Sequence, residues 1–478
     1  MSGRGGTAAV LALVLAVAGC GEGVRAPEVQ GEMPGRWSAT PTSGTEISAA
    51  WVRAFGVSEL DALVATADLD NLDVAAAAAK IAAAEAELAG TRAALGPVVT
   101  GEGGVGRTVT PGTRGAFSPP FRASVSDDYR LGLGASWQID LNGRLRALAA
   151  SREASLSAAR IERDMVRLST TTAIVDAWLR VAAARDRLVI ARESIATAER
   201  TLAVYRRRLE VGTATALDVA QQQSLVASQR ATVPDIEIEL GQTRNSLVVL
   251  TGRAPEALAI RARGLSGVRV PTIGAGVPST LLARRPDIAA AEASLTAAAA
   301  DVEAARAAFL PEISLTGSTG LASAFLKNLL RPDAIASSAA AGLTAPILDS
   351  GARQADLDAA RAAHEGLVAT YRKTVHEALA EVENALIAVD RNRRHEILQQ
   401  DVVRAARRAQ KLTEERLAEG TIDVTTVLEA ERTLFQAEQT LVAVRLARLR
   451  SVVTLAGALG GGWIKDTPAP TARREGKS

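Results

Sequence analysis

The chain has 478 residues and a net charge of +2, and 47% of its residues are hydrophobic although only 3% are aromatic. Its 55 basic and 53 acidic residues are balanced, so it lacks the charge bias that nucleic-acid binding usually needs, and we expect no nucleic-acid partner. Much of the apolar share is alanine, which forms helices but has no bulk. The composition therefore favours a thin wall of closely packed helices over a wide globular core.

The N-terminus has the pattern of a targeting segment. Arg4 precedes the apolar residues 8–17, and the small residues that follow lead directly to Cys20, as in a bacterial lipobox. Cys20 is the only cysteine of the chain, and a free exposed thiol is a liability outside the cytoplasm. We predict that residues 1–19 are a removed signal peptide and that Cys20 carries the lipid that anchors the protein in the outer membrane. An ordinary secretory signal with an incidental cysteine is the alternative.

The next part of the chain is predicted as a periplasmic lead-in, residues 20–72, followed by a first structural repeat, residues 73–280. A helical pattern runs from about Leu60 to Leu95 and stops at Gly96-Pro97. Two strands follow, at about 98–109 and 130–140. No residue that breaks helices then occurs until the tip of a hairpin near residue 212.

That uninterrupted helix covers residues 144–210, which is roughly 100 Å at 1.5 Å per residue. A returning helix runs from Ala216 to about Leu250, and Pro234 inside it is expected to kink it. The repeat closes with a linker, residues 252–280, that is rich in glycine and proline. The two shorter helices of the repeat, from Asp73 to Leu95 and from Ala216 to Leu250, are expected to stack end to end beside the long one.

The second structural repeat, residues 281–458, has the same order of elements. Strands are predicted at about 313–321 and 338–347, and a second long helix is predicted over 352–419. Its hairpin tip lies near residue 420, and residues 459–478 form a loose tail. The long helix carries an apolar seam with a 3.5-residue period, typical of coiled coils, at Tyr371, Val375, Ala378, Val382, Ala385 and Val389.

The two repeats share a distinctive tip sequence about 208 residues apart. It reads Arg208-Leu209-Glu210-Val211-Gly212-Thr213 in the first copy and Arg416-Leu417-Ala418-Glu419-Gly420-Thr421 in the second. This offset extends to Gly252 and Gly460, whereas Asp73 and Pro97 match Asp287 and Pro311 at an offset of about 214. A period this long is no solenoid repeat, so the chain is a duplicated half. A tight turn between helices needs a residue that accepts positive φ, which explains both tip glycines.

The predicted strands alternate between apolar and polar residues. Leu131, Leu133, Ala135, Trp137 and Ile139 would share one face, opposite Gly132, Gly134, Ser136 and Gln138. Ile313, Leu315 and Leu321 alternate with Ser314, Thr316, Ser318 and Gly320, and Leu343 and Ile347 alternate more weakly with Ser338, Gly342 and Thr344. Such ten-residue segments are typical of membrane β-barrels, although a half-buried strand of a soluble sheet shows the same pattern.

The number of strands separates these alternatives. Two strands per repeat give four per chain, and four strands cannot close into a barrel. An open sheet of four strands would leave unpaired strand edges, which are not tolerated in lipid. A membrane location therefore requires several chains to share one barrel, with eight strands in a dimer or twelve in a trimer.

The chain resembles the TolC family of outer-membrane efflux channels, in its lipoprotein branch of the NodT and OprM type. The resemblance rests on the duplication, the Leu-x-x-Gly-Thr tips and the segments Leu281-Leu282-Ala283-Arg284-Arg285-Pro286-Asp287-Ile288, Ala291-Glu292 and Phe309-Leu310-Pro311-Glu312-Ile313-Ser314-Leu315. It implies a mainly α fold with a membrane β-barrel: a homotrimer with a twelve-stranded barrel joined to a twelve-helix α-barrel in the periplasm. It also implies a periplasmic adaptor and an inner-membrane RND-type transporter as partners.

The resemblance also implies where such a channel would be gated. The family's acidic constrictions match Asp218 and Gln221 in the first repeat and Thr426 and Glu429 in the second, so Thr426 replaces a frequent acid. Leu209 and Leu417 occupy positions where an aromatic residue is common, which puts the family's tyrosine contacts in doubt. The expected adaptor contacts are the tips Val211, Gly212, Thr213, Glu419, Gly420 and Thr421. For Asp218, plain capping of a helix N-terminus is the alternative to gating.

Other signals indicate no chemistry. The Gly-rich run from Gly101 to Gly106 fits a dinucleotide-binding pattern but follows a helix and precedes none, so a Gly-rich strand is favoured. The three histidines, His364, His376 and His395, lack the spacing of metal ligands, and no nucleophile–base pair has supporting context. We predict no enzyme activity, no cofactor and no metal.

The predicted function is a passive exit duct for drugs or small toxic compounds in a tripartite efflux pump, gated at the periplasmic tips. A duct for type I protein secretion and a periplasmic coiled-coil tether without a pore are the alternatives.

Overall fold

The computed structural model describes residues 33–39, 44–110, 124–257 and 259–465. The predicted signal peptide, Cys20 and the end of the tail lie outside these residues. The described helices of more than three residues are η2 (Trp51–Phe55), α2 (Ser58–Asp70), α3 (Leu72–Ala93), α4 (Arg144–Glu210), α5 (Ala216–Leu250), α6 (Leu281–Arg284), α7 (Pro286–Ala307), α8 (Ala352–Glu419) and α9 (Val424–Ala458). The strands are β1 (Thr45–Glu46), β2 (Val98–Thr110), β3 (Ser124–Ile139), β4 (Ile273–Gly274), β5 (Glu312–Ser323) and β6 (Ile335–Thr344).

The two long helices confirm the sequence prediction. Helix α4 has 67 residues and α8 has 68, with the predicted ends, and α5 continues through Pro234 without interruption. The helical pattern from Leu60 to Leu95 forms two helices, because Asn71 divides it into α2 and α3, and the part expected to start near Asp73 is α3. The backbone of Asn71 is extended, and its Oδ1 accepts a 2.9 Å hydrogen bond from Val74 N, which caps α3. None of the described helices is long and apolar enough to cross a membrane.

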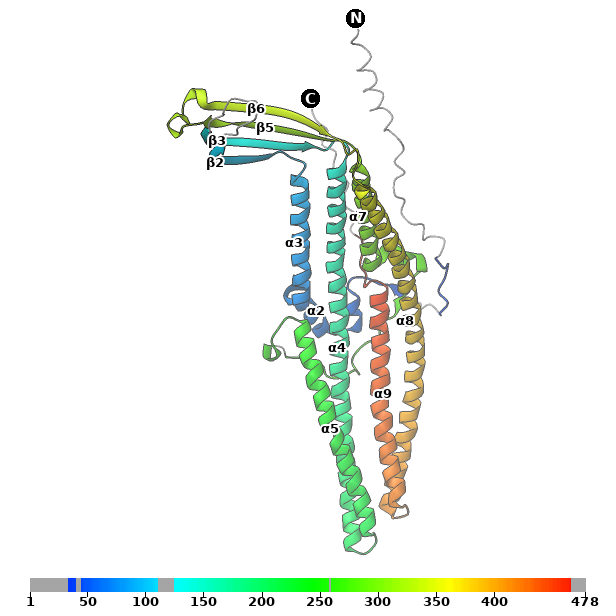
Figure 1. Ribbon diagram of the computed structural model, residues 1–478. Coiled ribbons are helices and arrows are strands. Elements are labelled where there is room, and N and C mark those ends of the chain that lie inside the picture. The colour runs from blue at the N-terminus through cyan, green and yellow to red at the C-terminus, as the bar shows by residue number, and fades with distance from the viewer. Residues whose placement is uncertain (1–32, 40–43, 111–123, 258, 466–478) are drawn as a thin grey trace. The chain divides into compact units, whose positions relative to one another are not determined.

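The shorter helices stack end to end along the long ones, as predicted (Figure 1). Helices α3 and α5 both pack on α4, while α7 and α9 both pack on α8. The junctions are close: a Cβ added to Gly252, after α5, would lie 1.9 Å from the Asp70 carbonyl oxygen. A Cβ on Gly460, after α9, would lie 2.0 Å from that of Arg284. Glycine is therefore required at the equivalent junction of each repeat.

The predicted seam of α8 is largely buried. Val375, Ala378, Val382 and Ala385 lie in the interior, while Tyr371 and Val389 are half-buried. The buried side chains of α4 include many alanines, such as Ala182, Ala183 and Ala184. Small side chains let neighbouring helices approach closely, so the composition produces the expected wall of helices.

The lead-in is attached to the linker between the repeats. Strand β1 pairs in parallel with β4, with Thr45 opposite Ile273, and Trp37 donates from Nε1 to the Gly276 carbonyl at 2.9 Å. The lead-in also reaches α8, because the backbone amides of Ser38 and Ala39 donate to Glu383 Oε1 at 2.6 and 3.0 Å.

The four long strands form one antiparallel sheet in the order β2-β3-β5-β6, at the end of the long helices opposite the hairpin tips (Figure 1). Each repeat has two long strands, as predicted, besides the two-residue strand β4 in the first repeat, but two strand boundaries were wrong. Strand β3 begins at Ser124, six residues before the predicted start. Strand β6 lies three residues earlier than predicted and ends at Thr344, so Ile347 follows it and is 97% exposed.

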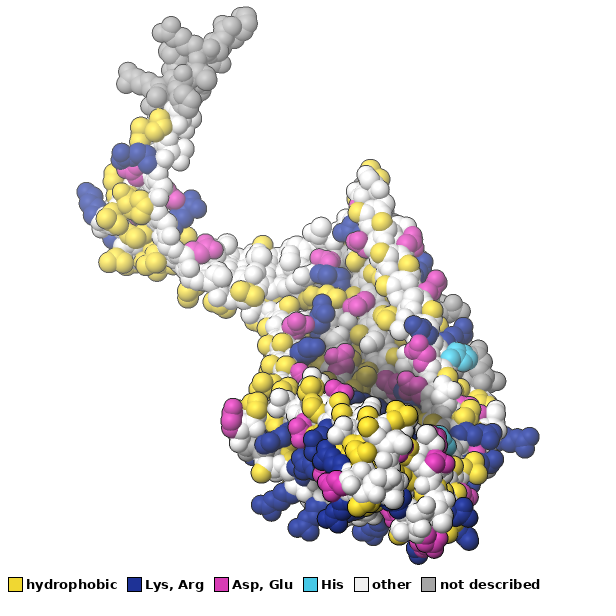
Figure 2. Space-filling view, turned by 90° about the horizontal axis from the view of Figure 1, so that it is seen from below, with side chains coloured by type: hydrophobic (Ala, Val, Ile, Leu, Met, Phe, Trp, Pro, Cys, Tyr) yellow, Lys and Arg dark blue, Asp and Glu magenta, His cyan; other side chains and the backbone are white. Residues whose placement is uncertain are grey.

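Cross-strand register confirms the predicted faces of the sheet. Leu131 lies opposite Leu321 and Trp137 opposite Leu315, whereas Gly134 lies opposite Ser318 on the other face. In Figure 2, hydrophobic side chains follow one side of the projecting sheet. The outer strands β2 and β6 each pair on one side only, so within this chain the sheet is open at both edges.

Candidate functional site at the hairpin tips

The two tip turns have the same construction. Gly212 and Gly420 adopt φ of 79° and 76°, in the left-handed region that glycine accepts without strain. The following threonine closes each turn: Thr213 N donates to the Arg208 carbonyl at 2.8 Å, and Thr421 N donates to that of Arg416 at 3.1 Å. Their hydroxyl groups bond the same carbonyl oxygens at 3.2 and 3.3 Å. The repeated Gly-Thr pair is therefore a turn motif.

The helices that leave the tips are capped by the same residue types in exchanged positions. In the first tip, Thr215 N donates to Asp218 Oδ2 at 2.7 Å and Asp218 N donates to Thr215 Oγ1 at 3.2 Å, a capping box. In the second tip, Asp423 is the cap and accepts from Thr426 N at 2.9 Å. The 208-residue offset aligns Thr215 with Asp423 and Asp218 with Thr426.

This exchange changes the interpretation of Thr426. The second tip has kept a carboxylate, but three residues earlier, at Asp423, which the sequence analysis missed. The Thr-x-x-Asp and Asp-x-x-Thr patterns were the available signal. Hydrogen bonds from the Thr425 hydroxyl and from the amide and hydroxyl of Thr426 hold the pKa of Asp423 below its usual range.

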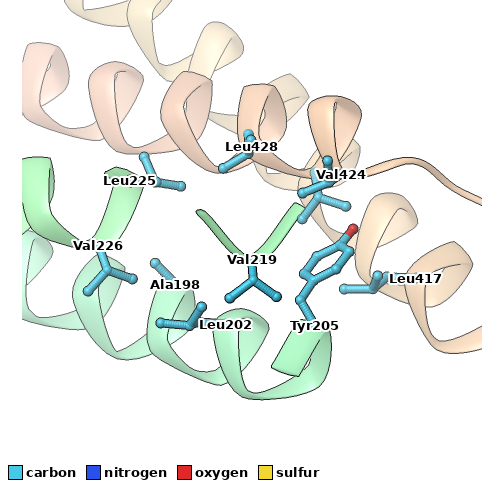
Figure 3. Packing of buried hydrophobic residues seen from close by; sticks show 10 residues of the cluster. Ala198, Leu202, Tyr205, Val219, Leu225, Val226, Leu417, Val424 and Leu428 are labelled. Carbon is cyan, nitrogen blue, oxygen red and sulfur yellow. The ribbon is translucent and has the colours of Figure 1, made fainter. Parts of the chain in front are cut away.

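The four helix ends at the tips pack around one apolar cluster (Figure 3). Its buried members are Ala198, Leu202, Tyr205, Val219, Leu225, Val226, Leu417, Val424, Val427 and Leu428. They come from both hairpins, so the tips of one chain form a single packed unit. Arg208 strengthens the connection, because its Nη2 donates to the carbonyl oxygen of Leu417.

Tyr205 is the aromatic member of this cluster. It lies one turn before Leu209 and is 3% exposed, and within the described residues its hydroxyl has no hydrogen-bond partner. Burial raises the pKa of Tyr205 to about 12, and the carboxylates of Asp218, Asp423 and Glu431 act on it in the same direction. Acids of both hairpins therefore influence this one side chain.

The predicted gate and docking residues differ in their exposure. Thr426 and Glu429 are exposed on α9, whereas Asp218 and Gln221 are half-buried on α5. The six predicted docking residues, Val211, Gly212, Thr213, Glu419, Gly420 and Thr421, are all exposed. Figure 2 views the molecule from this end and shows both acidic and basic side chains among apolar ones.

The glycine run and the histidines noted in the sequence lie on regular elements away from the tips. The run from Gly101 to Gly106 lies inside strand β2, as predicted. His364, His376 and His395 all lie on α8. Over the described ranges, no group of three or more histidine, cysteine, aspartate or glutamate residues is placed to hold a metal ion.

The architecture defines a class of protein: a duplicated pair of long helical hairpins with a four-stranded sheet at one end and a packed tip at the other. The pattern of the outer membrane efflux protein family matches residues 63–253 and 277–461, and the chain belongs to this family.

Curated relatives cover nearly the whole length. The chain is 38% identical over 419 residues to the pyoverdine export outer membrane protein OpmQ of Pseudomonas aeruginosa, covering 87% of this chain and 88% of that protein. It is 32% identical over 449 residues to the antibiotic efflux pump outer membrane protein ArpC of Pseudomonas putida, covering 93% and 92%. The solved structure of the outer-membrane channel OprN superposes with a TM-score of 0.85 at 28% identity, covering 93% and 99%.

These likenesses confirm the TolC-family resemblance and the fold class, which combines a β-barrel with a helical barrel. The protein is an outer-membrane component of an efflux pump.

Proposed function

We propose that three copies of this chain form a passive exit duct of a tripartite efflux pump, gated at the hairpin tips. The observation that carries the proposal is the open sheet. Strands β2 and β6 leave unpaired backbone groups along 13 and 10 residues, and such edges are not tolerated in lipid. Pairing β6 of one chain with β2 of the next satisfies them, and three chains give a twelve-stranded barrel.

The tips are the natural place for a gate because three-fold symmetry crowds like charges there. Asp218, Asp423 and Glu429 would each become a ring of three carboxylates, which repel one another and attract cations. Asp218 also belongs to the capping box of α5, and this local role does not exclude a place in such a ring. Gln221 and Thr426 would contribute polar, uncharged positions between these rings.

The exposed tip residues would dock a periplasmic adaptor, which connects the duct to an inner-membrane RND-type transporter. The adaptor-docking residues are Val211, Gly212, Thr213, Glu419, Gly420 and Thr421. A lipid on Cys20 would add a second attachment to the outer membrane. The cargo would be drugs or small toxic compounds, since one relative is named for pyoverdine export and another for antibiotic efflux.

Two measurements test the proposal: the mass of the purified protein in mild detergent and its conductance in planar bilayers. Purified protein in mild detergent should have the mass of three chains, and a monomer would contradict the shared barrel. In planar bilayers, Asp218→Ala combined with Glu429→Ala should raise the conductance of the resting channel. The matched control is Asp235→Ala with Glu365→Ala, which removes two exposed acids away from the tips. Equal effects of the two pairs would rule out gating by these residues.

Loss of the gene tests the pump assignment separately. Cells without it should become more sensitive to small toxic compounds, and unchanged sensitivity would count against efflux. A protein that never conducts, even with the tip acids removed, would instead point to a tether without a pore.

A further inference from the structure

A buried carboxylate joins the two hairpins just above the tips. Glu431, on α9, is 6% exposed. Its Oε1 accepts a 2.6 Å hydrogen bond from Thr201 Oγ1 on α4, and its Oε2 accepts a 3.0 Å bond from Gln222 Nε2 on α5. Gln222 Nε2 also donates to the Ala198 carbonyl at 3.1 Å, so both its hydrogens are used. Three helices from the two hairpins thus meet at one side chain.

Among the described residues, this carboxylate forms no ion pair. Thr201 and Gln222 are 7% and 0% exposed, and both are neutral donors. The charged groups that act on Glu431 electrostatically are Glu414 from α8 and Arg200 from α4. The phenol of Tyr205, also from α4, interacts with it electrostatically, and α5 contributes the neutral amide of Gln222. Arg200 is exposed and its Nη2 bonds Thr197 at 3.0 Å, so solvent screens its charge.

Directional contacts matter here because, apart from the hydrogen bond from Arg208 to the Leu417 carbonyl, the tip cluster between the hairpins packs through apolar surfaces. Besides Tyr205, the cluster consists of leucine, valine and alanine side chains, whose attraction is not directional and tolerates sliding. A single buried polar residue can fix the register of packed helices at a cost in stability. Separating the hairpins would leave the Thr201 hydroxyl and one hydrogen of the Gln222 amide without an acceptor unless water replaced the carboxylate.

We propose that Glu431 is a positioning residue that fixes the register of hairpin α8–α9 against hairpin α4–α5 and is released when the tips part. The inference rests on the proposed gating at the tips and identifies the contact inside each chain that such gating must break. Glu431 differs from the tip acids because it acts within one chain and faces no opening.

Ionisation gives this contact a pH dependence of known sign. Burial raises the pKa of Glu431, and the hydrogen bonds from Thr201 and Gln222 only partly oppose that effect. Below the ordinary pKa of glutamate, about 4.3, the acid is neutral in both states and the packed hairpins carry no penalty. As the pH rises through the raised pKa, the packed state must bury a charge, so the packing weakens.

Hydrogen exchange of the full chain in detergent, followed by mass spectrometry over residues 424–434, tests the proposal. Exchange is measured at about pH 5 and about pH 8 and corrected for the intrinsic rate. Glu431→Gln removes the charge, keeps an oxygen that can accept from Gln222 Nε2, and offers an amide that can donate to the Thr201 hydroxyl, whereas Glu431→Ala removes both contacts. The matched control is Glu415→Gln, the same change at an exposed carboxylate on α8.

The wild type and Glu415→Gln should exchange faster at the higher pH. Glu431→Gln should exchange slowly at both values, and Glu431→Ala should be faster than the wild type by about tenfold at both. A Glu431→Gln protein that keeps the wild-type pH dependence, or a Glu431→Ala protein that exchanges like the wild type, overturns the proposal.

Conductance of the same variants separates this proposal from the function on which it rests. Glu431→Ala should open the channel more often, and Glu431→Gln should hold it closed at high pH. If the exchange pattern is found but no variant conducts, including the one without tip acids, the gated duct fails while the positioning contact stands. If the channel gates but the exchange pattern is absent, only the role of Glu431 fails.

Discussion

Asn71 donates from Nδ2 to the carbonyl oxygen of Leu250 at 2.8 Å and so joins the start of α3 to the end of α5. The second repeat makes the equivalent connection with a different side chain: Arg285 Nη1 donates to the Ala458 carbonyl, also at 2.8 Å. The four residues correspond at the two offsets of the duplication, 214 and 208. Each bond satisfies a carbonyl that a helix end would otherwise leave without a partner. The duplication has therefore conserved the junction while its chemistry changed.

The glycines at these junctions should not tolerate a side chain. Gly252→Ala and Gly460→Ala place a Cβ about 2 Å from a backbone oxygen, at positive φ, so each should destabilise the protein by about 2 kcal/mol. The measurement is the rate of irreversible heat inactivation of the purified protein. Gly241→Ala, within α5 and without any neighbour inside 4 Å, is the control and should be neutral or slightly stabilising. Similar rates for all three variants would show that the junctions can relax.

Arg285 should be the most sensitive arginine at the second junction. Its side chain is 8% exposed, and it bonds Asp287 at 3.0 and 2.6 Å, Glu381 at 2.8 Å and the Ala458 carbonyl. Arg285→Met leaves these acceptors without their donor and should cost roughly 2–3 kcal/mol. Arg361→Met removes an exposed pair with Asp358 at 3.6 Å and should change the thermal midpoint little. A small effect at Arg285 would show that water replaces its contacts.

The exchanged caps should both be needed for ordered tips. Thr215→Ala removes the side chain that caps α5 and should destabilise its first turn by about 1 kcal/mol. Asp423→Ala should fray α9 in the same way. Hydrogen exchange over residues 216–220 and 424–428 reports each helix separately. Thr197→Ala, which removes a hydroxyl that bonds only within α4, is the control and should leave both segments unchanged.

Acid should weaken the cap of α9, whereas it should strengthen the packing around Glu431. Because the pKa of Asp423 is lowered in the folded tip, its stabilising effect is complete above the ordinary value of about 3.9 and is lost as the pH falls through the lowered pKa. Exchange over residues 424–428 should therefore accelerate, relative to the intrinsic rate, only in strong acid. Asp423→Asn should abolish this acid response, and a response that survives the substitution would assign it to another group.

Local patterns in the sequence were enough to define most of the elements. The ends of α4 and α8 follow from the glycine turns at Gly143, Gly212, Gly351 and Gly420, because neither helix contains proline and the one internal glycine of α8, Gly366, does not end it. The cap at Asn71 is a local signal, because its Oδ1 accepts from Val74 N, whereas its bond to Leu250, 179 residues away, follows from no local pattern. Strand β6 was placed three residues late because alanine and serine alternate weakly there.

The sequence by itself determined the duplication, the two long hairpins, the four strands and the faces of the sheet, since periodicity and turn residues act over a few neighbours. Only the tertiary structure decided which polar groups meet between the hairpins. Thr201, Gln222 and Glu431 come from three helices, and no spacing along the chain predicts that they share one buried site. The acid of the second tip is different: the Asp-x-x-Thr pattern at Asp423 is present in the sequence, and the structure shows that it is a helix cap.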